Sequence, residues 1–477
     1  MMKTRKLDDV MASYPKIDHK KVQHAWSEIR PSFHHKMIVL DDDPTGVQTV
    51  HGISVYTDWT EETIEQGFLE DQQMFFILTN SRAFTAKETE QVHRDIAERI
   101  EKVSKKHQKP YLIISRGDST LRGHYPLETE VLRRTIEEQN DVKVDGEVLL
   151  PFFKEGGRLT IDNIHFVQQD DRLVPAGETE FAKDRTFGYS SSHLGEWIEE
   201  KTHGQYRQEE VTYISLQSLR QMDFDRIVEQ LMQVSKFGKV VVNAIEEDDV
   251  RIFATALIQA MQQGKNYVFR TAAAFTKVIG DISSRPLLTR EELIEEEQTK
   301  GGLIIVGSHV QKTTDQLREL QTLSSLHFIE FDAHLVLDTD AFKQEVDRVR
   351  LEAERKVAEG ISTVIFTKRE RLDLGDGMEE EELKLSVQIS NAVTSIVRNF
   401  SIRPNYLIAK GGITSSDVGT KGLCVKRATV SGQIAPGIPV WKTGEESIFP
   451  YTSYVIFPGN VGAVTTLKDV VLTLEGK

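Results

Sequence analysis

Short apolar runs alternate with longer, charge-rich periodic segments along almost the whole chain. The apolar runs contain four or five residues, are rich in β-branched and aromatic types, and are bounded by turn residues, as buried strands are. They span residues 37–40, 74–78, 111–115, 148–152, 239–242, 267–270, 303–306, 327–331, 363–366, 406–409 and 454–457. The segments between them, such as 85–106 and 340–359, have the apolar spacing of helices. Because strands and helices alternate, we expect α/β domains with mainly parallel sheets flanked by helices.

The length of the chain indicates more than one domain, because single cores rarely grow beyond about 250–300 residues. At 477 residues, two large domains are expected, with three as the alternative. A charged, proline-containing segment at 282–299 precedes a Gly-Gly pair and a new strand. We therefore predict a helical arm at 1–34, an N-terminal domain at 35–281, a linker at 282–300 and a C-terminal domain at 301–477.

Composition and charge exclude several classes of function. The net charge of −15 argues against nucleic-acid binding, which needs a basic face. No segment is apolar enough for a membrane span, and the N-terminal residues lack the apolar core of a signal peptide. Cys424 is the single cysteine, so neither an intrachain disulfide nor a thiolate zinc site is expected. We expect a cytoplasmic protein that binds small molecules, with no nucleic-acid or membrane partner.

Three consecutive carboxylates, Asp41, Asp42 and Asp43, follow the first predicted strand and precede a Pro-Thr-Gly turn. In open α/β sheets, ligands bind at the carboxyl ends of such strands. Adjacent acids repel one another, which is costly unless a cation or the hydroxyl groups of a substrate meet them. A solvated acidic turn is the alternative, but the direct junction with a buried strand favours a ligand site.

Arginines and further polar residues follow the next two strands. After strands 74–78 and 111–115 come Ser81, Arg82, Arg116, Asp118, Ser119, Arg122 and Gly123. The guanidinium groups of Arg82, Arg116 and Arg122 have the planar fork that grips a carboxylate with two hydrogen bonds. Asp42, Asp43 and Asp118 are able to accept hydrogen bonds from sugar-like hydroxyl groups. For Arg116 and Asp118, a local ion pair is the alternative interpretation.

Glycines and hydroxyl groups follow the strands of the second half. The loops after strands 303–306, 406–409 and 454–457 contain Gly307-Ser308, Gly411-Gly412-Ile413-Thr414 and Gly459-Asn460-Val461-Gly462. Because glycine has no Cβ, backbone amides in such loops approach an anion closely. The phosphates of a nucleotide suit these loops, although neither a Walker motif nor a dinucleotide-binding glycine fingerprint is present. This division between the halves is what a two-substrate enzyme needs.

A series of motifs occurs in a fixed order along residues 35–470. They are Asp42-Asp43-Pro44-Thr45-Gly46, Ser81-Arg82, Asp118-Ser119-Thr120-Leu121-Arg122-Gly123, Gly156-Gly157-Arg158, Glu178-Thr179, Gly307-Ser308, Gly411-Gly412-Ile413-Thr414 and Gly459-Asn460-Val461-Gly462. Together they resemble the four-carbon acid-sugar kinase family. The resemblance implies an acid-sugar-binding N-terminal domain, a nucleotide-binding C-terminal domain and an active site in the cleft between them. The implied reaction is ATP-dependent phosphorylation of a terminal hydroxyl group of a tetronate or oxo-tetronate.

The residue types and the resemblance together assign residues to each substrate. The expected acid-sugar contacts are Asp42, Ser81, Arg82, Arg116, Ser119, Arg122, Gly123 and Arg158. The expected ATP contacts are Ser308, Gly411, Gly412, Ile413, Thr414, Gly459, Asn460 and Gly462. Mg²⁺ is expected to bridge the phosphates, and the sequence contains no dedicated set of metal ligands.

Asp43 and Asp118 are the candidates for catalysis. Asp43 lies among like charges, which we expect to raise its pKa and to make it the better proton acceptor. Asp118 lies between Arg116 and Arg122 in sequence, and we expect it to orient the substrate. Arg122 is the first choice as the clamp on the substrate carboxylate, with Arg82 and Arg116 as helpers.

Two other functions compete with the kinase. A haloacid-dehalogenase-like phosphohydrolase would use Asp41 as nucleophile and Asp43 as acid and base, but would leave the glycine loops of the second half without a role. A non-catalytic acid-sugar-binding protein is the third interpretation. The identity of the acid, the hydroxyl group phosphorylated and the oligomeric state, a homo-oligomer included, stay open.

Overall fold

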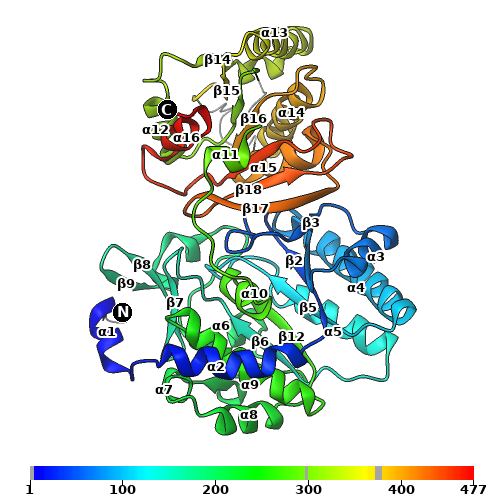
Figure 1. The fold of residues 1–477 in the computed structure, drawn as a ribbon, viewed down its shortest axis with the longest axis vertical. Helices are drawn as coiled ribbons and strands as arrows, with labels where there is room; N and C mark the ends of the chain where they lie inside the picture. Colours follow the sequence, from blue (N-terminus) through cyan, green and yellow to red (C-terminus); the bar gives the residue numbers. More distant parts are fainter. Residues whose placement is uncertain (1–4, 296–298, 371–378) are drawn as a thin grey trace. The chain divides into compact units, whose positions relative to one another are not determined.

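The computed structural model describes residues 5–295, 299–370 and 379–477 of the chain, which divides into two compact units (Figure 1). Unit 1 comprises Met1–Thr49 and Asp58–Ser283, and unit 2 comprises Val50–Thr57 and Ser284–Lys477. Residues 1–4 of the predicted arm and 296–298 of the predicted linker lie outside the described residues. The boundaries predicted at 34, 281 and 300 stay predictions.

Unit 1 is built on seven parallel strands in the order β10-β11-β6-β12-β5-β2-β4. Their bounds, in this order, are Thr212–Ile214, Gly238–Val242, Gly146–Leu150, Tyr267–Thr271, Tyr111–Arg116, Lys36–Asp41 and Met74–Leu78. Most residues of these strands are buried, since helices cover the sheet on both sides. The mainly parallel α/β architecture predicted from the alternating sequence is therefore confirmed.

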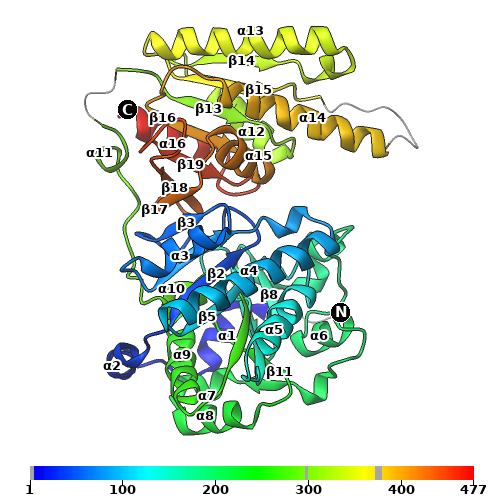
Figure 2. The ribbon, with the colours of Figure 1, turned by 90° about the vertical axis from the view of Figure 1, so that its right-hand side faces the viewer.

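Two groups of helices pack on this sheet (Figures 1 and 2). Helices α4 (Ala86–His107) and α5 (Leu127–Gln139) pack together, with α3 (Glu61–Leu69) beside α4. In the other group, α2 (His19–Ile29), α8 (Phe224–Gln233) and α10 (Ala273–Ile279) pack on α9 (Glu247–Gln262). The remaining helices of unit 1 are α1 (Leu7–Ser13), α6 (Leu194–Lys201) and α7 (Leu216–Arg220).

A small antiparallel sheet, in the order β1-β9-β8-β7, completes unit 1. Its strands are Arg5–Lys6, Arg172–Pro175, Ile164–Gln169 and Arg158–Ile161. The turn between β7 and β8 contains Asp162 and Asn163 in the left-handed conformation, which these residues tolerate better than most. This hairpin begins at Arg158, one of the predicted acid-sugar contacts.

Unit 2 is built on a mixed sheet in the order β3-β17-β18-β19-β16-β13-β15-β14. Their bounds, in this order, are Ser54–Tyr56, Arg427–Ala435, Ile438–Thr443, Ser453–Phe457, Tyr406–Lys410, Leu303–Val306, Thr363–Thr367 and His327–Phe331. The last five strands are parallel, and the first three join them in antiparallel pairs. The helices are α11 (Arg290–Leu293), α12 (Gln311–Leu320), α13 (Thr339–Ala358), α14 (Glu379–Arg398), α15 (Gly412–Asp417) and α16 (Thr466–Glu475).

Strand β3 belongs to unit 2 although its residues lie inside the segment 35–281 of the sequence. Ser54 and Val55 pair with Thr429 and Ala428 of β17, so β3 satisfies the backbone groups along that edge of the sheet. The chain enters unit 2 four residues after Gly46 and returns to unit 1 at Asp58.

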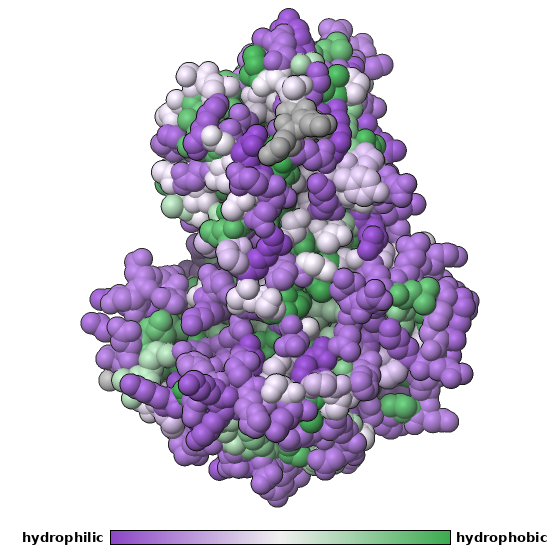
Figure 3. Space-filling view, viewed as in Figure 1, coloured by the Kyte–Doolittle hydropathy of each residue, from purple (hydrophilic) through white to green (hydrophobic). Residues whose placement is uncertain are grey.

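The face of the molecule drawn in Figure 3 is mostly polar. On the face drawn in Figure 3, hydrophilic residues predominate and hydrophobic ones are scattered among them. Within the described ranges, no helix combines the length and the apolar character that crossing a membrane requires.

Candidate active site

The ends of four neighbouring strands bring the predicted acid-sugar residues together in unit 1. The last residue of β2, Asp41, pairs with Leu78 of β4 and with Arg116 of β5, and Arg116 pairs with Thr271 of β12. Because all four strands are parallel, the loops that follow them begin at one edge of the sheet. This edge is the one at which open α/β sheets bind ligands.

Asp41 lies at this edge of the sheet, but its side chain is buried. Its side chain is 2% exposed, with its Oδ1 3.5 Å from Nη1 of Arg116. A Cβ on Gly46 would lie 2.0 Å from Oδ2 of Asp41, so only glycine fits over this carboxylate. Burial, together with the charges of Asp42 and Asp43, raises the pKa of Asp41 to about 8 despite Arg116. A nucleophile must be open to its substrate, so this geometry argues against the phosphohydrolase interpretation.

Asp42 and Asp43 are both engaged by Arg82, which lies in the short 3₁₀ turn after β4. Arg82 donates to Asp42 from Nη2 at 2.8 Å and from Nε at 3.2 Å, and its Nη1 lies 3.6 Å from Oδ2 of Asp43. The amide and the hydroxyl group of Thr45 donate to Oδ1 of Asp43 at 2.8 and 2.6 Å.

The predicted upward shift of the Asp43 pKa is wrong. Burial favours the protonated acid, but Arg82 and the two hydrogen bonds from Thr45 outweigh it and hold the pKa of Asp43 below its ordinary value. The like charges seen in the sequence are neutralised by an arginine that the fold supplies. Asp43 is therefore ionised at neutral pH.

The loop after β5 places Asp118 and Arg122 face to face. Arg122 donates from Nε to Oδ2 of Asp118 at 2.7 Å, and its Nη1 lies 3.7 Å from Oδ2 of Asp184. Thr120 also donates to Asp118. Burial opposes ionisation of Asp118, but Arg82, Arg122 and Thr120 prevail and lower its pKa well below the ordinary value.

Two buried residues that the sequence analysis missed, Arg270 and Glu128, support this loop. Arg270, at the end of β12, donates to Glu128 at 3.2 Å and to the carbonyl of Arg122 at 2.8 Å. A Cβ on Gly123, whose φ is +120°, would lie 2.9 Å from Nη2 of Arg270, so the loop packs directly on this guanidinium. Ser81 donates to Glu128 at 2.7 Å, which fixes its hydroxyl group away from a ligand role in this conformation. Arg270 could have been found from the sequence, because it is the last residue of the predicted strand 267–270, as the other site residues follow predicted strands.

His165 holds the backbone at Ser119. Its Nε2 lies 2.8 Å from the carbonyl of Ser119 and its Nδ1 lies 3.0 Å from the hydroxyl group of Thr160. Burial lowers the pKa of His165 to about 4, so the ring is neutral at pH 7. The neutral ring with its proton on Nε2 donates to Ser119 and accepts from Thr160. His165 thus positions the loop from β8.

Arg158 differs from the other arginines of the site. Its Nη1 donates to the carbonyl of Gly156, and its guanidinium carbon lies 5.5 Å from the ring centroid of Phe181, on which Arg122 also packs at 5.2 Å. Among the residues that the structure describes, no carboxylate lies within ion-pair distance of Arg158, and its Nε has no acceptor. Burial lowers the pKa of Arg158. A ligand carboxylate would supply the missing anion.

The glycine loops of unit 2 also meet at one edge of a sheet. Lys410, the last residue of β16, pairs with the last residues of the parallel strands on either side of it, Val306 of β13 and Phe457 of β19. The loops that follow these residues contain all the predicted ATP contacts.

Ser308 lies where the three loops converge. A Cβ on Gly411, whose φ is +127°, would lie 2.9 Å from Cβ of Ser308, and one on Gly459 would lie 3.1 Å from its Oγ. A Cβ on Gly307 would lie 2.4 Å from Oγ1 of Thr414. Side chains larger than hydrogen are thus excluded around the hydroxyl groups of Ser308 and Thr414, and the backbone is left open to a ligand.

The other predicted ATP contacts surround this centre less closely. Gly412 is the first residue of α15, and Ile413 is 72% exposed. Asn460 is exposed, and Gly462, with φ +84°, packs on Thr466 of α16. These residues flank the three-loop convergence rather than form it.

Lys410 is a further residue that the sequence analysis did not assign. Its Nζ donates to the carbonyls of Pro458 at 2.5 Å and Gly459 at 3.2 Å and lies 4.1 Å from the ring centroid of Phe457. Burial and the charge of Lys312 lower its pKa to about 7. Lys410 therefore holds the Gly459 loop against the end of β16.

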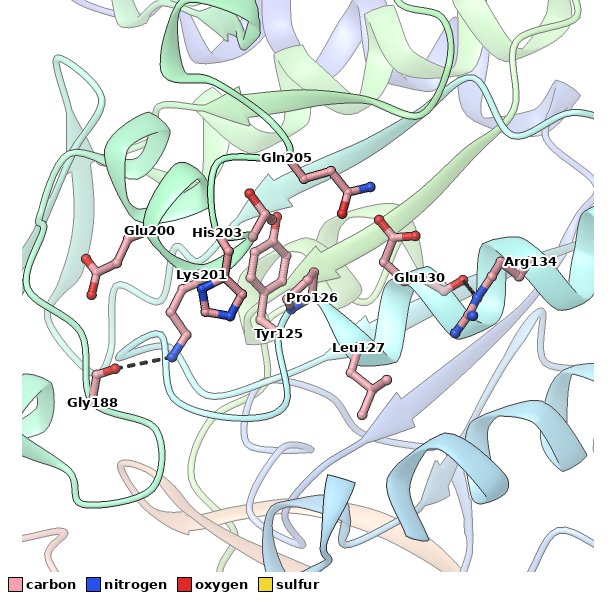
Figure 4. A pocket seen from close by; sticks show the side chains of 11 residues that line it. Tyr125, Pro126, Leu127, Glu130, Arg134, Gly188, Glu200, Lys201, His203 and Gln205 are labelled. Carbon is pink, nitrogen blue, oxygen red and sulfur yellow. Dashed lines mark hydrogen bonds between the residues drawn. The ribbon is translucent and has the colours of Figure 1, made fainter. Parts of the chain in front are cut away.

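A cavity of about 800 Å³ in unit 1 lies apart from these clusters. Tyr125, Glu130, Arg134, Lys201 and His203 are among the residues that line it (Figure 4). Lys201 donates to the carbonyl of Gly188 at 3.2 Å across one side of it. None of the predicted site residues lines this cavity. Across the described part of the chain, no group of three or more His, Cys, Asp or Glu residues is placed to hold a metal ion.

Comparison with known proteins assigns both halves of the chain to a class. A family model for a sugar-binding N-terminal domain matches residues 37–279, and one for a nucleotide-binding C-terminal domain matches residues 303–467. D-erythronate kinase from Heliobacterium modesticaldum (strain ATCC 51547 / Ice1) is 22% identical over 319 residues, which span 66% of this chain and 66% of the relative. The chain therefore belongs to the four-carbon acid-sugar kinase family, as the motifs predicted.

Solved structures agree with this fold. A crystal structure of a Haemophilus influenzae protein covers 92% of this chain and 100% of its own, with a TM-score of 0.61 at 14% identity. A Salmonella typhimurium LT2 protein, provisionally described as a tRNA synthase, covers 90% of this chain and 97% of its own, with a TM-score of 0.63 at 16% identity. At these identities the likeness is one of fold alone.

Proposed function

We propose that this chain is an ATP-dependent kinase that phosphorylates a terminal hydroxyl group of a four-carbon acid sugar, a tetronate or an oxo-tetronate. Family membership and the similarity to D-erythronate kinase support an acid-sugar kinase. The observation that carries the finer proposal is Arg158, a guanidinium without a carboxylate partner beside ionised aspartates in unit 1. Such a site suits a ligand that has one carboxylate and several hydroxyl groups.

The acid sugar is expected to bind through two kinds of contact. Arg158 supplies the charge for its carboxylate, and Arg122 packs on the same ring, that of Phe181. Asp42, Asp43 and Asp118 accept hydrogen bonds from the hydroxyl groups, and neighbouring arginines lower the pKa of Asp43 and of Asp118. This assignment moves Arg122, the first choice from the sequence, to a supporting role, since Asp118 and Asp184 already hold it.

ATP is expected to bind at the convergence of loops around Ser308 in unit 2. The close packing of the loops supports this site. A Cβ on Gly307, Gly411 or Gly459 would collide with, or crowd, a residue of a neighbouring loop. Amides of these loops and the hydroxyl groups of Ser308 and Thr414 are donors for phosphate oxygens. Mg²⁺ would be held mainly by those oxygens, as is usual for an ion that keeps several waters.

Phosphoryl transfer requires the protein to position the two substrates and to stabilise charge, rather than to form a covalent bond with them. The acceptor oxygen attacks the γ-phosphorus, the bond to the leaving ADP oxygen breaks, and the hydroxyl proton passes to a carboxylate. Asp43 suits this role because Thr45 occupies its Oδ1 and leaves Oδ2 for the hydroxyl group. In a loose transition state the proton moves late, so a base with a low pKa suffices to orient and accept it. The location of the active site between the two domains stays a prediction.

A turnover assay tests the proposal. The purified chain is incubated with ATP, Mg²⁺ and a panel of tetronates and oxo-tetronates, with the matching four-carbon polyols as uncharged controls. We expect ADP release that depends on an acid and a product that gains one phosphoryl group by mass spectrometry. Binding of an acid without ADP release would favour the binding-protein alternative, and phosphate release from a phosphorylated acid would favour the phosphohydrolase.

A further inference from the structure

The predicted nucleotide loops contribute amides and hydroxyl groups but no cation. A polyphosphate carries several negative charges, and the whole chain has a net charge of −15. Binding against this field requires local positive charge. Besides Lys312, which is exposed on α12, three cations lie at this edge of the sheet: Lys410, which ends β16, and Lys368 and Arg369, which follow β15.

Two of these three cations are already engaged. Lys410 donates to the carbonyls of Pro458 and Gly459. Lys368 lies 3.4 Å from Oδ1 of Asp332. The ammonium groups of both lysines are therefore already bound by oxygen atoms of the protein.

Arg369 is in direct contact with the centre of the loop convergence. Its Nη2 donates to the carbonyl of Ser308 at 2.5 Å and to the hydroxyl group of Thr314 at 2.9 Å. Ser308 is the residue that Gly411 and Gly459 closely approach. Arg369 therefore touches the same residue as two of the three glycine loops.

The guanidinium of Arg369 has no anionic partner. Its Nε and Nη1, which carry three N–H groups, are shielded from solvent and have no acceptor. Within the described ranges, no Asp or Glu lies within ion-pair distance of it, and burial lowers its pKa. A shielded cation with unmet donors is costly in the ligand-free protein and gains most from an arriving anion. In unit 1, by contrast, Arg82 and Arg122 have carboxylate partners.

We infer that Arg369 is a binding residue for the phosphates of the nucleotide, at the Ser308 side of the loop convergence. The inference rests on the proposed function for the identity of the nucleotide, but its chemistry, a polyphosphate on a guanidinium, can be tested separately. Lys cannot replace it fully, because an ammonium group lacks the planar set of donors that spans Ser308 and a phosphate at once.

The experiment measures affinities for adenosine, ADP and ATP by calorimetry in wild type, Arg369→Gln and Arg369→Lys. Arg318→Gln is the matched control, because Arg318 is an exposed arginine of α12 that pairs with Asp315. We expect Arg369→Gln to weaken ADP and ATP ~10- to 100-fold, the usual worth of hydrogen bonds to a charged group, and Arg369→Lys to weaken them less. Adenosine affinity and the control variant should stay at wild-type values.

Two outcomes in Arg369→Gln overturn the inference. Equal losses for adenosine and ADP in Arg369→Gln assign it a purely structural role, and unchanged ATP affinity removes it from the site. Inorganic tripolyphosphate separates this inference from the proposed function. If wild type binds no ATP but binds tripolyphosphate through Arg369, the kinase proposal fails and the anion site stands. If neither ligand binds, both fail. Circular dichroism of each variant checks that unit 2 remains folded.

Discussion

Arg82 grips Asp42 with two parallel hydrogen bonds, from Nη2 to Oδ1 at 2.8 Å and from Nε to Oδ2 at 3.2 Å. The Asp42 side chain is 3% exposed and that of Arg82 22%, so the pair is largely removed from water. The guanidinium of Arg82, which was expected to bind a substrate carboxylate, therefore binds the carboxylate of Asp42 instead. Arg82 sets the positions of Asp42 and Asp43, and a substrate meets carboxylates that are already neutralised in part.

The first prediction concerns this pair. Arg82→Lys keeps the charge but loses the second hydrogen bond of the fork, so the free energy of unfolding of unit 1 should fall by about 1–3 kcal/mol. Urea denaturation at pH 7, with tryptophan fluorescence as the readout, measures this free energy of unfolding. Arg94→Lys is the control, because Arg94 forms a surface pair with Glu90 that should contribute less than about 1 kcal/mol. Equal effects of the two substitutions would show that the Arg82 pair is no stronger than a surface pair.

The second prediction separates Arg158 from Arg122. Arg158→Gln removes the guanidinium without a carboxylate partner, so the KM for the acid should rise ~10- to 100-fold while the KM for ATP is unchanged. Arg122→Lys keeps a cation beside Asp118 and should raise the KM for the acid less. Steady-state kinetics on both variants decides the order. A larger effect of Arg122→Lys would restore Arg122 as the main carboxylate clamp.

The parallel core was predictable because its strands are continuous apolar runs. The run 74–78 coincides with β4, and the runs 303–306 and 454–457 lie within strands of unit 2. Strand β17 was missed because it alternates between buried and partly exposed residues, which is the pattern of a half-covered antiparallel strand. The placement of β3 in unit 2 depends on pairing with residues more than 370 positions later, which no local pattern reveals.

The candidate site was predictable where polar residues follow strands directly. Asp42, Arg116 and Ser308 were recognised on that basis, and the structure places each at the carboxyl edge of a sheet. Arg270 and Glu128 were missed because the two are 142 positions apart and their role depends on their contact. The direction of the Asp43 pKa was wrong for the same reason, since the neighbouring acids are visible in the sequence and Arg82 is not.

The third prediction tests the glycine loops. Gly411→Ala should weaken ATP binding by at least tenfold, because its φ of +127° and the 2.9 Å approach to Ser308 leave no room for a Cβ. Binding of the acid to unit 1 should be unchanged. Gly204→Ala is the control, since Gly204 also has a positive φ, +79°, but nothing lies within 4 Å of the added Cβ. Calorimetry with ATP on both variants gives the comparison, and wild-type affinity in folded Gly411→Ala would remove this loop from the nucleotide site.

The fourth prediction uses the buried carboxyl of Asp41. Its pKa is about 8 in the folded protein, whereas an aspartate in the unfolded chain has a pKa of about 4. Between these two values the folded state binds the proton more tightly, so the contribution of Asp41 to stability is full at low pH and is lost as pH rises toward 8. Asp41→Asn stays neutral and avoids this loss. The stability of the variant relative to wild type should therefore increase from pH 5 to pH 8, by at most about 1.4 kcal/mol per pH unit. Chemical denaturation at several pH values measures the difference, and a constant difference would mean that Asp41 is ionised throughout.

The last prediction distinguishes the two catalytic candidates. Asp43 has one oxygen occupied by Thr45 and one directed to a long contact with Arg82, whereas Asp118 is held by Arg122 at 2.7 Å and by Thr120. Asp43→Asn should therefore lower kcat ~10²-fold or more with little change in ATP binding, as removal of a general base does.

Asp118→Asn should act mainly on the KM for the acid, because it releases Arg122. Thr45→Val is the matched control for Asp43: it removes the hydroxyl donor at 2.6 Å and keeps the carboxylate, so its kcat should fall much less. Single-turnover measurements of phosphoryl transfer in the three variants decide between the assignments. A larger loss of kcat in Asp118→Asn, with the affinity for the acid intact, would make Asp118 the proton acceptor and leave Asp43 to orient the substrate.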